Sequence, residues 1–440
     1  MPPAPSESTP PSKKPFYSGR SEHRARSHES AQHESSEPQT PPPVHPLIPV
    51  GDAKMVRTQA ELAGLVEQLR AAGRFAYDSE FIGELTYIPK LCLIQVATTQ
   101  AVSLIDPIEK IDLTPFWELL CDAAVEKIVH AGEQDLEPAF RHLLRCPANV
   151  FDTQIAAGFI GIAYPTSLSK LVRSMVNVNL GKGLTFTHWD QRPLSPMQLR
   201  YAADDVRYLL AVRENIGRRL TELGHEAWAM EESEALCDPE QFQFDPDHQC
   251  RRARGASSLS PSGLAILREL IIWRNNAARL HDLPPRTFLK DDILVEMSRN
   301  PVRSVDKLAR VRGLPRPVEQ SHGKEIVGAI GRAAAMPSQE LPASRQHEET
   351  PTEKFRADGL WAAVQCLSLG RGIDPNLVAN RQEISQLYRY FSGGLAEPDV
   401  RLLKGWRLEA VGNALLSMVR KAGSAQINWQ DGQLRAKAAD

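Results

Sequence analysis

Residues 75–81 read FAYDSEF and residues 90–99 read KLCLIQVATT, and these two stretches decide the fold. Both are short apolar runs bounded by polar residues, which is typical of half-buried strands. AVSLIDPI (101–108) and KIVHAG (127–132) have the same character. Three strands in a meander, followed by alternating helices and strands, predict an α/β fold in which a mixed sheet is flanked by helices.

Helical spacing of apolar residues accompanies the strands. It predicts helices in ELAGLVEQLR (61–70), WELLCDAA (117–124) and QDLEPAFRHLL (134–144). NVFDTQIAAGFIG (149–161) predicts a short strand that runs into another helix. One long helix is expected over residues 196–224.

The overall composition is that of a globular protein in water. The 440 residues favour two or three domains, and 42% of them are hydrophobic and 24% charged. No apolar run reaches the ~20 residues that span a bilayer, and the opening MPPAPSESTP lacks the order of a secretory signal. We therefore expect a cytoplasmic protein with no membrane partner. Six scattered cysteines without a C-x-x-C pair favour free thiols over a zinc site or a disulfide framework.

Changes in composition divide the chain. Residues 1–45 are rich in Pro, Ser, Glu and His and hold almost no large apolar residues, so they predict a disordered tail. Polar stretches at 231–257 and 337–350 predict two linkers. The remaining parts are an α/β domain at 46–230, an all-helical domain at 258–336 and a second all-helical domain at 351–430.

Asp78 and Glu80 are two residues apart on the first predicted strand, so both side chains face the same side of the sheet and can share one cation. By itself D-x-E is also common on solvated edge strands. Asp135 stands where a helix begins, and for that residue alone a helix cap is the simpler interpretation. Asp152, at a strand end, has the same ambiguity.

Tyr201 and Asp205 are four residues apart in a helical segment and therefore lie one turn apart on the same face. An ordinary surface pair explains this spacing equally well. Asp204 points about 100° away around the helix, so it is less suited to the same site.

Taken together and in this order, these residues resemble the three motifs of the DEDD family of 3′-5′ exonucleases, in its tyrosine-bearing branch. The first motif is Asp78-Ser79-Glu80, the second is Asp135 within HAGEQDL, and the third is YAADDVRYL. The stretches LCLIQVAT, VFDTQIAA and WDQRPLSPMQLRYAADDVRYL are similar to ribonuclease D, over roughly residues 50–225. The resemblance implies a ribonuclease H-like fold and hydrolysis of RNA from its 3′ end, with release of nucleoside 5′-monophosphates.

The same resemblance implies two divalent ions as cofactors, and catalytic roles for Asp78, Glu80, Asp135, Tyr201 and Asp205. Asp78 would bridge the ions, while Glu80 and Asp205 would complete the ion that holds the attacking water. Asp135 would hold the second ion through water. Carboxylate oxygens without His or Cys suit Mg²⁺ or Mn²⁺ better than zinc. Tyr201 would orient the water, since a tyrosine pKa near 10 keeps the hydroxyl protonated.

His130 and Asp135 have the H-x₄-D spacing of the family's histidine branch, but the pair comes too early in the chain and leaves the third motif unexplained. His130 is therefore expected to support the site from a strand end.

The loop LGKGLTFTHWDQRPL (180–194) resembles the segment before the family's last motif, and within it Lys182 and Arg192 are predicted to contact RNA. Trp189 is expected to pack in the core. His188 departs from the family pattern, where Asp or Asn is expected, which leaves the local hydrogen bonding open.

Residues 258–336 resemble the helicase-and-ribonuclease-D C-terminal (HRDC) domain through L-x-x-W-R at 270–274, a Pro-Pro break at 284–285 and D-x-L-x-E at 292–296. This block holds 13 Lys and Arg against 8 Asp and Glu. With Arg251, Arg252 and Arg254 just before it, it predicts an RNA-binding surface, although solvated helix faces explain most single arginines equally well. Residues 351–430 resemble a second, more diverged copy.

The leading hypothesis is a monomeric 3′-5′ exoribonuclease acting on transfer-RNA precursors and other small structured RNAs with single-stranded 3′ ends. A DNA-directed exonuclease is an alternative, because no residue visibly reads the 2′-hydroxyl. A catalytically weak RNA-binding scaffold is another. An inactive copy usually lacks a carboxylate, and here all four are present.

Overall fold

The computed structural model describes residues 45–181, 187–342, 349–394 and 397–420, and two strands at 425–430 and 433–438. The predicted disordered tail, apart from His45, lies outside the described residues, as does Lys182.

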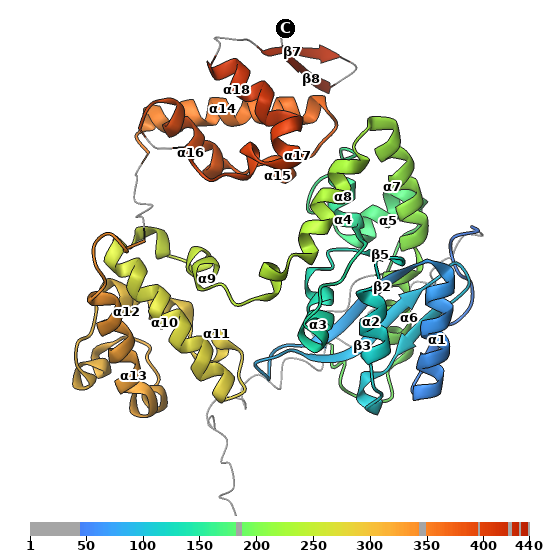
Figure 1. Cartoon of the computed structure of the whole chain (residues 1–440), viewed down its shortest axis with the longest axis horizontal. Coiled ribbons are helices and arrows are strands. Elements are labelled where there is room, and N and C mark those ends of the chain that lie inside the picture. Colours follow the sequence, from blue (N-terminus) through green and yellow to red (C-terminus); the bar gives the residue numbers. More distant parts are fainter. Residues whose placement is uncertain are drawn as a thin grey trace, which may run out of the picture. The chain divides into compact units, whose positions relative to one another are not determined.

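Six strands form one mixed sheet in the order β1-β4-β3-β2-β5-β6. Figure 1 labels β2, β3 and β5 of this sheet. β2, β3 and β4 form an antiparallel meander, while β5 runs parallel to β2, β6 to β5 and β1 to β4. The predicted meander and mixed sheet are confirmed. The sequence did not predict β1, which is three residues long. The strands are β1 (Lys54–Val56), β2 (Arg74–Ile82), β3 (Lys90–Ala97), β4 (Val102–Ile105), β5 (Glu126–Val129) and β6 (Val150–Asp152).

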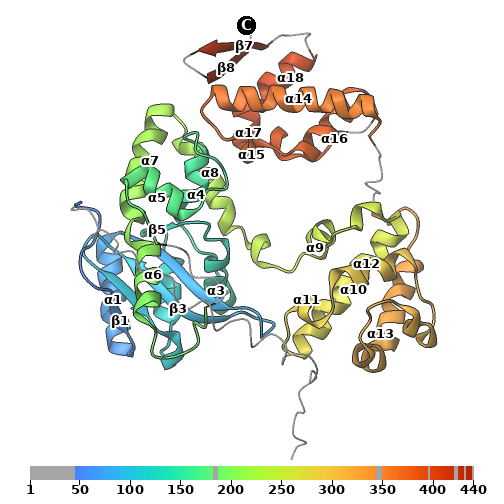
Figure 2. The same cartoon turned by 180° about the vertical axis from the view of Figure 1, so that it is seen from behind.

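Helices cover both faces of this sheet. On one face, α1 (Gln59–Ala72), α2 (Thr114–Leu120) and α3 (Glu133–Leu143) bury apolar side chains against the strands. On the other face, α6 (Pro196–Arg207) and the start of α7 (Leu209–Leu223) close a second core (Figure 2 gives the view from behind). Because strand side chains alternate, the two faces of β2 differ in chemistry, and the position of the carboxylates follows from that alternation.

The long helix expected over 196–224 is in fact two helices. α6 ends at Arg207, Tyr208 follows with φ −97° and ψ −10°, and α7 begins at Leu209. The guanidinium of Arg207 is buried and donates to the carbonyls of Pro49 (2.6 Å) and Gly51 (3.1 Å). The break therefore coincides with a contact to a segment more than 150 residues away, which no local pattern could indicate.

Three further helices complete the α/β region, by which we mean β1–β6 with α1–α8. They are α4 (Thr153–Gly158), α5 (Leu168–Val176) and α8 (Glu226–Glu234). α4 and α8 pack with α7 in a third cluster of buried apolar residues.

The first helical block, α9–α13, has a core of its own. Trp273 is buried in that core, and Arg274 beside it donates to the carbonyl of Leu289 (2.9 Å) and to Asp291 Oδ1 (2.6 Å). Residues 231–257, expected to form a linker, contain the end of α8 and the whole of α9. Three small buried residues among their charged neighbours join the core of the block, which the polar composition concealed: Cys250, Ala253 and Ala256. The helices are α9 (Pro246–Arg252), α10 (Pro261–Leu280), α11 (Pro285–Phe288), α12 (Asp291–Arg299) and α13 (Arg316–Ala334).

The second helical block, α14–α18, is followed by an antiparallel hairpin of β7 (Ala425–Gln430) and β8 (Gln433–Ala438). The prediction of helices alone up to residue 430 was wrong at this end. Both strands alternate apolar and polar residues (AQINWQ and QLRAKA), which is the strand period. The helices are α14 (Pro351–Gly370), α15 (Pro375–Val378), α16 (Arg381–Phe391), α17 (Gly405–Arg407) and α18 (Asn413–Arg420).

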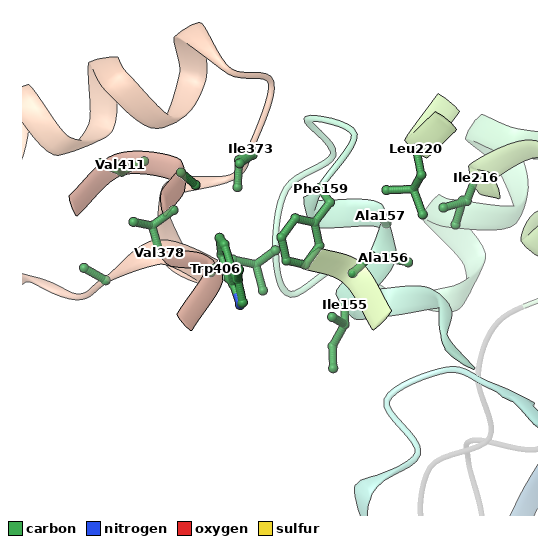
Figure 3. Packing of buried hydrophobic residues seen from close by; sticks show 14 of the residues in the cluster. Ile155, Ala156, Ala157, Phe159, Ile216, Leu220, Ile373, Val378, Trp406 and Val411 are labelled. Carbon is green, nitrogen blue, oxygen red and sulfur yellow. The ribbon is translucent and has the colours of Figure 1, made fainter. Parts of the chain in front are cut away.

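The second helical block shares one hydrophobic cluster with α4, α7 and α8 (Figure 3). Trp406 is 1% exposed, and its ring meets that of Phe159 edge-on at a centroid distance of 4.5 Å. The indole N–H of Trp406 donates to Glu232 Oε2 (2.8 Å), and Arg407 donates to Glu232 Oε1 (2.5 Å). This block is therefore built into the same folded unit as the α/β region. In the described part of the chain, no helix is long and apolar enough to cross a membrane.

Candidate active site

β2 places Asp78 and Glu80 on the α6 side of the sheet. Tyr77 belongs to the core under α1–α3, whereas Ala76 belongs to the core under α6. Asp78 and Glu80 follow Ala76 in steps of two and therefore share its face. The register with β3 shifts between Glu80 and Phe81, so a bulge ends the regular pairing just after the second carboxylate.

α6 places Tyr201 and Asp205 opposite these carboxylates. The helix begins with a capping box, in which the Ser195 hydroxyl accepts from the Gln198 N–H and the Gln198 side chain accepts from the Ser195 N–H. The Tyr201 hydroxyl donates to the Asp205 carboxylate one turn further on. The sequence therefore fixes both where the helix starts and which of its faces meets β2.

Asp204 has different surroundings from Asp205 although it is its neighbour. Its carboxylate lies 3.4 Å from the guanidinium of Arg207. As the sequence predicted, the two adjacent acids of α6 face different partners.

Asp135 lies in the first turn of α3 and is 8% exposed. It does not cap the helix, since the N-cap is Gly132 and makes no side-chain cap. Instead the Asp135 carboxylate accepts a hydrogen bond from the Ser79 hydroxyl, and its backbone carbonyl accepts from the Tyr77 hydroxyl (2.7 Å). Asp135 is thus fixed to β2 through the two residues that flank Asp78.

A pocket of about 180 Å³ opens between these elements. Its lining combines two carboxylates with the tyrosine, one histidine and two leucines: Asp78, Asp205, Tyr201, His130, Leu168 and Leu209. His130 directly follows the last residue of β5, Val129, and its ring nitrogens lie 3.0 Å from the Thr153 hydroxyl and 3.1 Å from the Thr166 carbonyl. Burial lowers the pKa of His130, so it stands in the wall as a neutral ring.

Burial and neighbouring acidic groups raise the pKa of all four carboxyls. Burial, followed by the charges of Asp135, Asp205 and Glu80, raises the pKa of Asp78 well above its usual range. Burial is also the largest cause for the other three, and raises the pKa of Glu80 to about 8, of Asp205 to about 7 and of Asp135 to about 6. Burial, followed by the charges of Asp205, Glu80 and Asp78, raises the pKa of Tyr201, which keeps its hydroxyl protonated at neutral pH.

This donor set fits hard divalent cations. It consists of carboxylate oxygens, and among the described residues none of the four acids forms an ion pair with Lys or Arg. Within those same residues, no group of three or more His, Cys, Asp and Glu side chains is already arranged to hold an ion.

Asp152 is a supporting residue whose role the sequence left ambiguous. It is 1% exposed, and its carboxylate accepts from the backbone N–H groups of Gln154 (2.7 Å), Ile155 (3.3 Å), Gly132 (3.0 Å) and Ala131 (3.2 Å). It therefore caps α4 and at the same time holds the turn that leads into α3. A helix cap was one of the two interpretations that the sequence left open for Asp152, and nothing local predicted the second pair of bonds.

Arg192 requires a correction, because its guanidinium is not available to RNA. Its five N–H donors go to both oxygens of the fully buried Asp106 (2.6 Å each) and to the carbonyls of Trp189, Gln191 and Cys92 (2.8 Å each). Arg192 therefore fixes the loop before α6 onto the sheet. Trp189 is 4% exposed and packs in the core, as predicted.

The other predicted RNA contacts differ in their surroundings. Arg251 lies 3.3 Å from Asp245, with both side chains about half exposed, whereas Arg252 and Arg254 are exposed. The fifth, Lys182, is outside the described residues.

Comparison with known proteins gives a consistent result along the chain. Residues 53–221 match a family described as 3′-5′ exonuclease, and residues 263–330 match the HRDC domain. The chain is 34% identical over 373 residues to a ribonuclease D of Gluconacetobacter diazotrophicus, which covers 83% of this chain and 93% of that protein. It is 34% identical over 374 residues to a ribonuclease D of Pseudomonas paraeruginosa, covering 84% and 98%. The crystal structure of Escherichia coli RNase D, an exoribonuclease involved in structured RNA processing, superposes with a TM-score of 0.72 at 28% identity and covers 84% of this chain and 99% of that one.

Proposed function

Because the chain belongs to the ribonuclease D family and is a 3′-5′ exoribonuclease, we propose that it trims single-stranded 3′ ends of structured RNAs, transfer-RNA precursors among them, one nucleotide at a time. The observation that carries this proposal is the convergence of Asp78 and Asp205 with Tyr201 on one pocket, with Glu80 and Asp135 close enough to raise the pKa values of the other acids.

We further propose that the site holds two divalent ions, Mg²⁺ or Mn²⁺. Asp78 would contribute to both, Glu80 and Asp205 to one, and Asp135 to the other through water. Bound ions of this kind activate a water and stabilise the leaving 3′-oxygen. The raised pKa values support this assignment, because a cluster of buried carboxylates is stable as ions only with a compensating positive charge.

Tyr201 is proposed to orient the attacking water. Its raised pKa keeps the hydroxyl protonated at neutral pH, and because its single O–H donates to Asp205, the tyrosine oxygen is left to accept a hydrogen bond from the water. A group in this state fixes the direction of a water molecule but does not remove its proton. Proton transfer from the water then falls to the carboxylates and solvent.

The second helical block is proposed to be a diverged HRDC copy. In the first block, α10, α11 and α12 begin at Pro261, Pro285 and Asp291. Their counterparts α14, α15 and α16 begin at residues 351, 375 and 381, each 90 residues later. The turn after the long helix has a positive φ in both blocks, at Asp282 and at Gly372. The division into one α/β domain and two helical domains remains part of this proposal, with α9 counted in the first helical domain. The monomeric state and the cytoplasmic location are also proposals.

RNA is favoured over DNA by the relatives, which are ribonucleases. Arg252 and Arg254, next to the basic first helical block, are proposed to bind the RNA backbone. The scaffold alternative is weaker, since all four carboxylates of the motif are present and gathered.

The proposal is tested by digesting a transfer-RNA precursor with a labelled 3′ trailer in Mg²⁺, beside a DNA oligonucleotide of the same sequence. We expect successive release of 5′-mononucleotides from the RNA, loss of release in Asp78→Ala, and at most slow attack on the DNA. Equal rates on both polymers would favour the DNA-directed alternative. Tight RNA binding without any release would favour the scaffold.

A further inference from the structure

Gln95 lies in the middle of β3, directly opposite Asp78. The antiparallel register pairs Asp78 with Gln95, and on the other side of β3 it pairs Gln95 with Leu104. Leu93 and Ala97, which alternate with Gln95 along the strand, both lie in the core under α6. The Gln95 side chain is therefore on the same face of the sheet as the Asp78 carboxylate, and directly opposed residues of this kind have Cβ atoms about 5 Å apart.

Gln95 is also fully buried and unsatisfied. Its relative exposure is 0%, and neither Nε2 nor Oε1 has a hydrogen-bond partner in the part of the chain that the structure describes. Arg141 and Arg274 each leave one N–H of several unpaired, whereas Gln95 leaves its whole amide without partners. Buried amides are almost always paired, so an orphaned one next to a functional carboxylate indicates a partner present only in the working state.

Asp78 needs such a partner when it is ionised. In the structure its carboxylate is supported by the backbone N–H of Ser79, while the acids around it add only negative charge. A buried carboxylate is stable as an ion when several donors or a cation surround it. An arginine or lysine in the neighbouring position would compete with a metal ion, whereas a neutral amide provides an N–H donor without adding charge.

We propose that Gln95 is a positioning residue of the nuclease site, whose amide N–H donates to the Asp78 carboxylate and whose carbonyl accepts from a water of the site once a divalent cation is bound. This inference rests on the function proposed above. Gln95 touches neither the RNA nor the scissile bond. It acts by holding Asp78 in one orientation, and supporting residues of this kind typically change metal affinity by 10- to 100-fold.

The test uses the full-length chain and the variant Gln95→Met, which keeps the length of the side chain and removes its hydrogen bonding. Leu104→Met, at the position opposite Gln95 on β4 and equally buried, is the matched control. Four quantities are measured for each: the melting temperature of the metal-free protein, the affinity for Mn²⁺ by calorimetry without RNA, and both kcat and KM on single-stranded RNA.

For Gln95→Met we expect an unchanged or higher melting temperature, because an unpaired buried amide is removed, together with about tenfold weaker Mn²⁺ binding. We expect kcat to fall about tenfold at limiting Mn²⁺ with KM for RNA unchanged, and Leu104→Met to match wild type in metal binding and kcat.

Mn²⁺ affinity and kcat of Gln95→Met within twofold of wild type would overturn the proposal. A metal-free melting temperature below that of wild type, or failure to fold, would overturn it too, because Gln95 would then support the fold itself. If the wild-type protein released no nucleotides, the proposed function would fail, while an active wild type with an equally active Gln95→Met would remove this inference alone.

Discussion

Asp204 and Asp205 show how far adjacent side chains of one helix can differ. Asp205 faces the pocket and bonds Tyr201, whereas Asp204 pairs with Arg207 on another side of α6. Asp204 is therefore a matched control for Asp205 in a test of the proposed metal ligands, because both are aspartates on the same helix and both side chains are partly buried.

Replacing Asp205 by Asn should reduce kcat at least 100-fold, because a proposed ligand loses its charge. The melting temperature of metal-free Asp205→Asn should not fall, since repulsion among the acids is relieved. Asp204→Asn should retain kcat while losing some stability through the Arg207 contact. Nucleotide release and thermal melts of both purified variants check this, and equal activity in the two would contradict the assignment.

Tyr201→Phe separates orientation from acid-base chemistry. We expect kcat to fall by about 10- to 100-fold with KM little changed, because the water loses its fixed hydrogen bond while the RNA-binding surfaces remain. Since the pKa of Tyr201 is raised, the wild-type pH–rate profile should show no tyrosine titration below about pH 9. An inflection near pH 8 that disappears in Tyr201→Phe would show that the residue acts as an ionised base.

The carboxylate cluster makes stability depend on pH and on metal together. Glu80, Asp205 and Asp135 have folded-state pKa values of about 8, 7 and 6, above the value near 4 of unfolded carboxyls. The folded state then binds more protons, so the contribution of these groups to stability is largest at low pH and declines as pH rises through this range.

A divalent cation replaces those protons. The rise in melting temperature caused by Mg²⁺ should be small at pH 5 and clearly larger at pH 8, and it should be much reduced in Asp205→Asn. A thermal shift titration at both pH values measures this. The same Mg²⁺ effect at pH 5 and pH 8 would show that the acids do not bind the ion.

At the residue scale, the sequence could predict side chains that share one element. Asp78 and Glu80 follow the strand period, and Tyr201 and Asp205 follow the helix turn. It could not predict partners distant along the chain. The pairing of Arg192 with Asp106 joins residues 86 positions apart, so the sequence predicts a phosphate contact at a position where the folded chain pairs the guanidinium with a buried carboxylate.

At the scale of elements, the meander and the long helices were predictable because each extends over several periods of its pattern. β1, with three residues, and α9, with small buried residues among charged ones, carry too few repeats to be detected. The break between α6 and α7 and the docking of α17 on α8 arise from packing between elements. Such contacts appear only when the chain is folded.

That docking predicts that the second helical block stabilises the α/β region. Trp406→Ala should lower the free energy of unfolding by about 3–5 kcal/mol, because removal of the fully buried indole leaves a cavity beside Phe159. Phe355→Ala, at a 78% exposed position of α14, is the control and should change it by less than about 0.5 kcal/mol. The free energy of unfolding of both variants is measured by denaturant titration followed by far-ultraviolet circular dichroism, a signal that does not depend on Trp406. Similar losses of unfolding free energy in both variants would argue against a shared core.

At the scale of the whole molecule, RNA binding should reside in a local basic surface, because the net charge of the chain is −2. With Asp78→Asn to prevent hydrolysis, Arg252→Gln combined with Arg254→Gln should weaken binding of single-stranded RNA. The slope of the logarithm of the RNA association constant against the logarithm of the salt concentration should become shallower by about 0.7 for each phosphate that the protein no longer neutralises. Arg70→Gln, on α1 across the sheet from the pocket, should alter neither quantity. An unchanged slope in the double variant would place the RNA elsewhere.

The central claim, that acids of β2, α3 and α6 jointly hold divalent ions, is tested most directly by anomalous diffraction from crystals of the full-length protein soaked in Mn²⁺. Two anomalous peaks about 4 Å apart are predicted. Both should lie within bonding distance of Asp78, one of them also beside Glu80 and Asp205. Manganese peaks elsewhere with this pocket empty, at a Mn²⁺ concentration that supports nucleotide release in solution, would contradict the account.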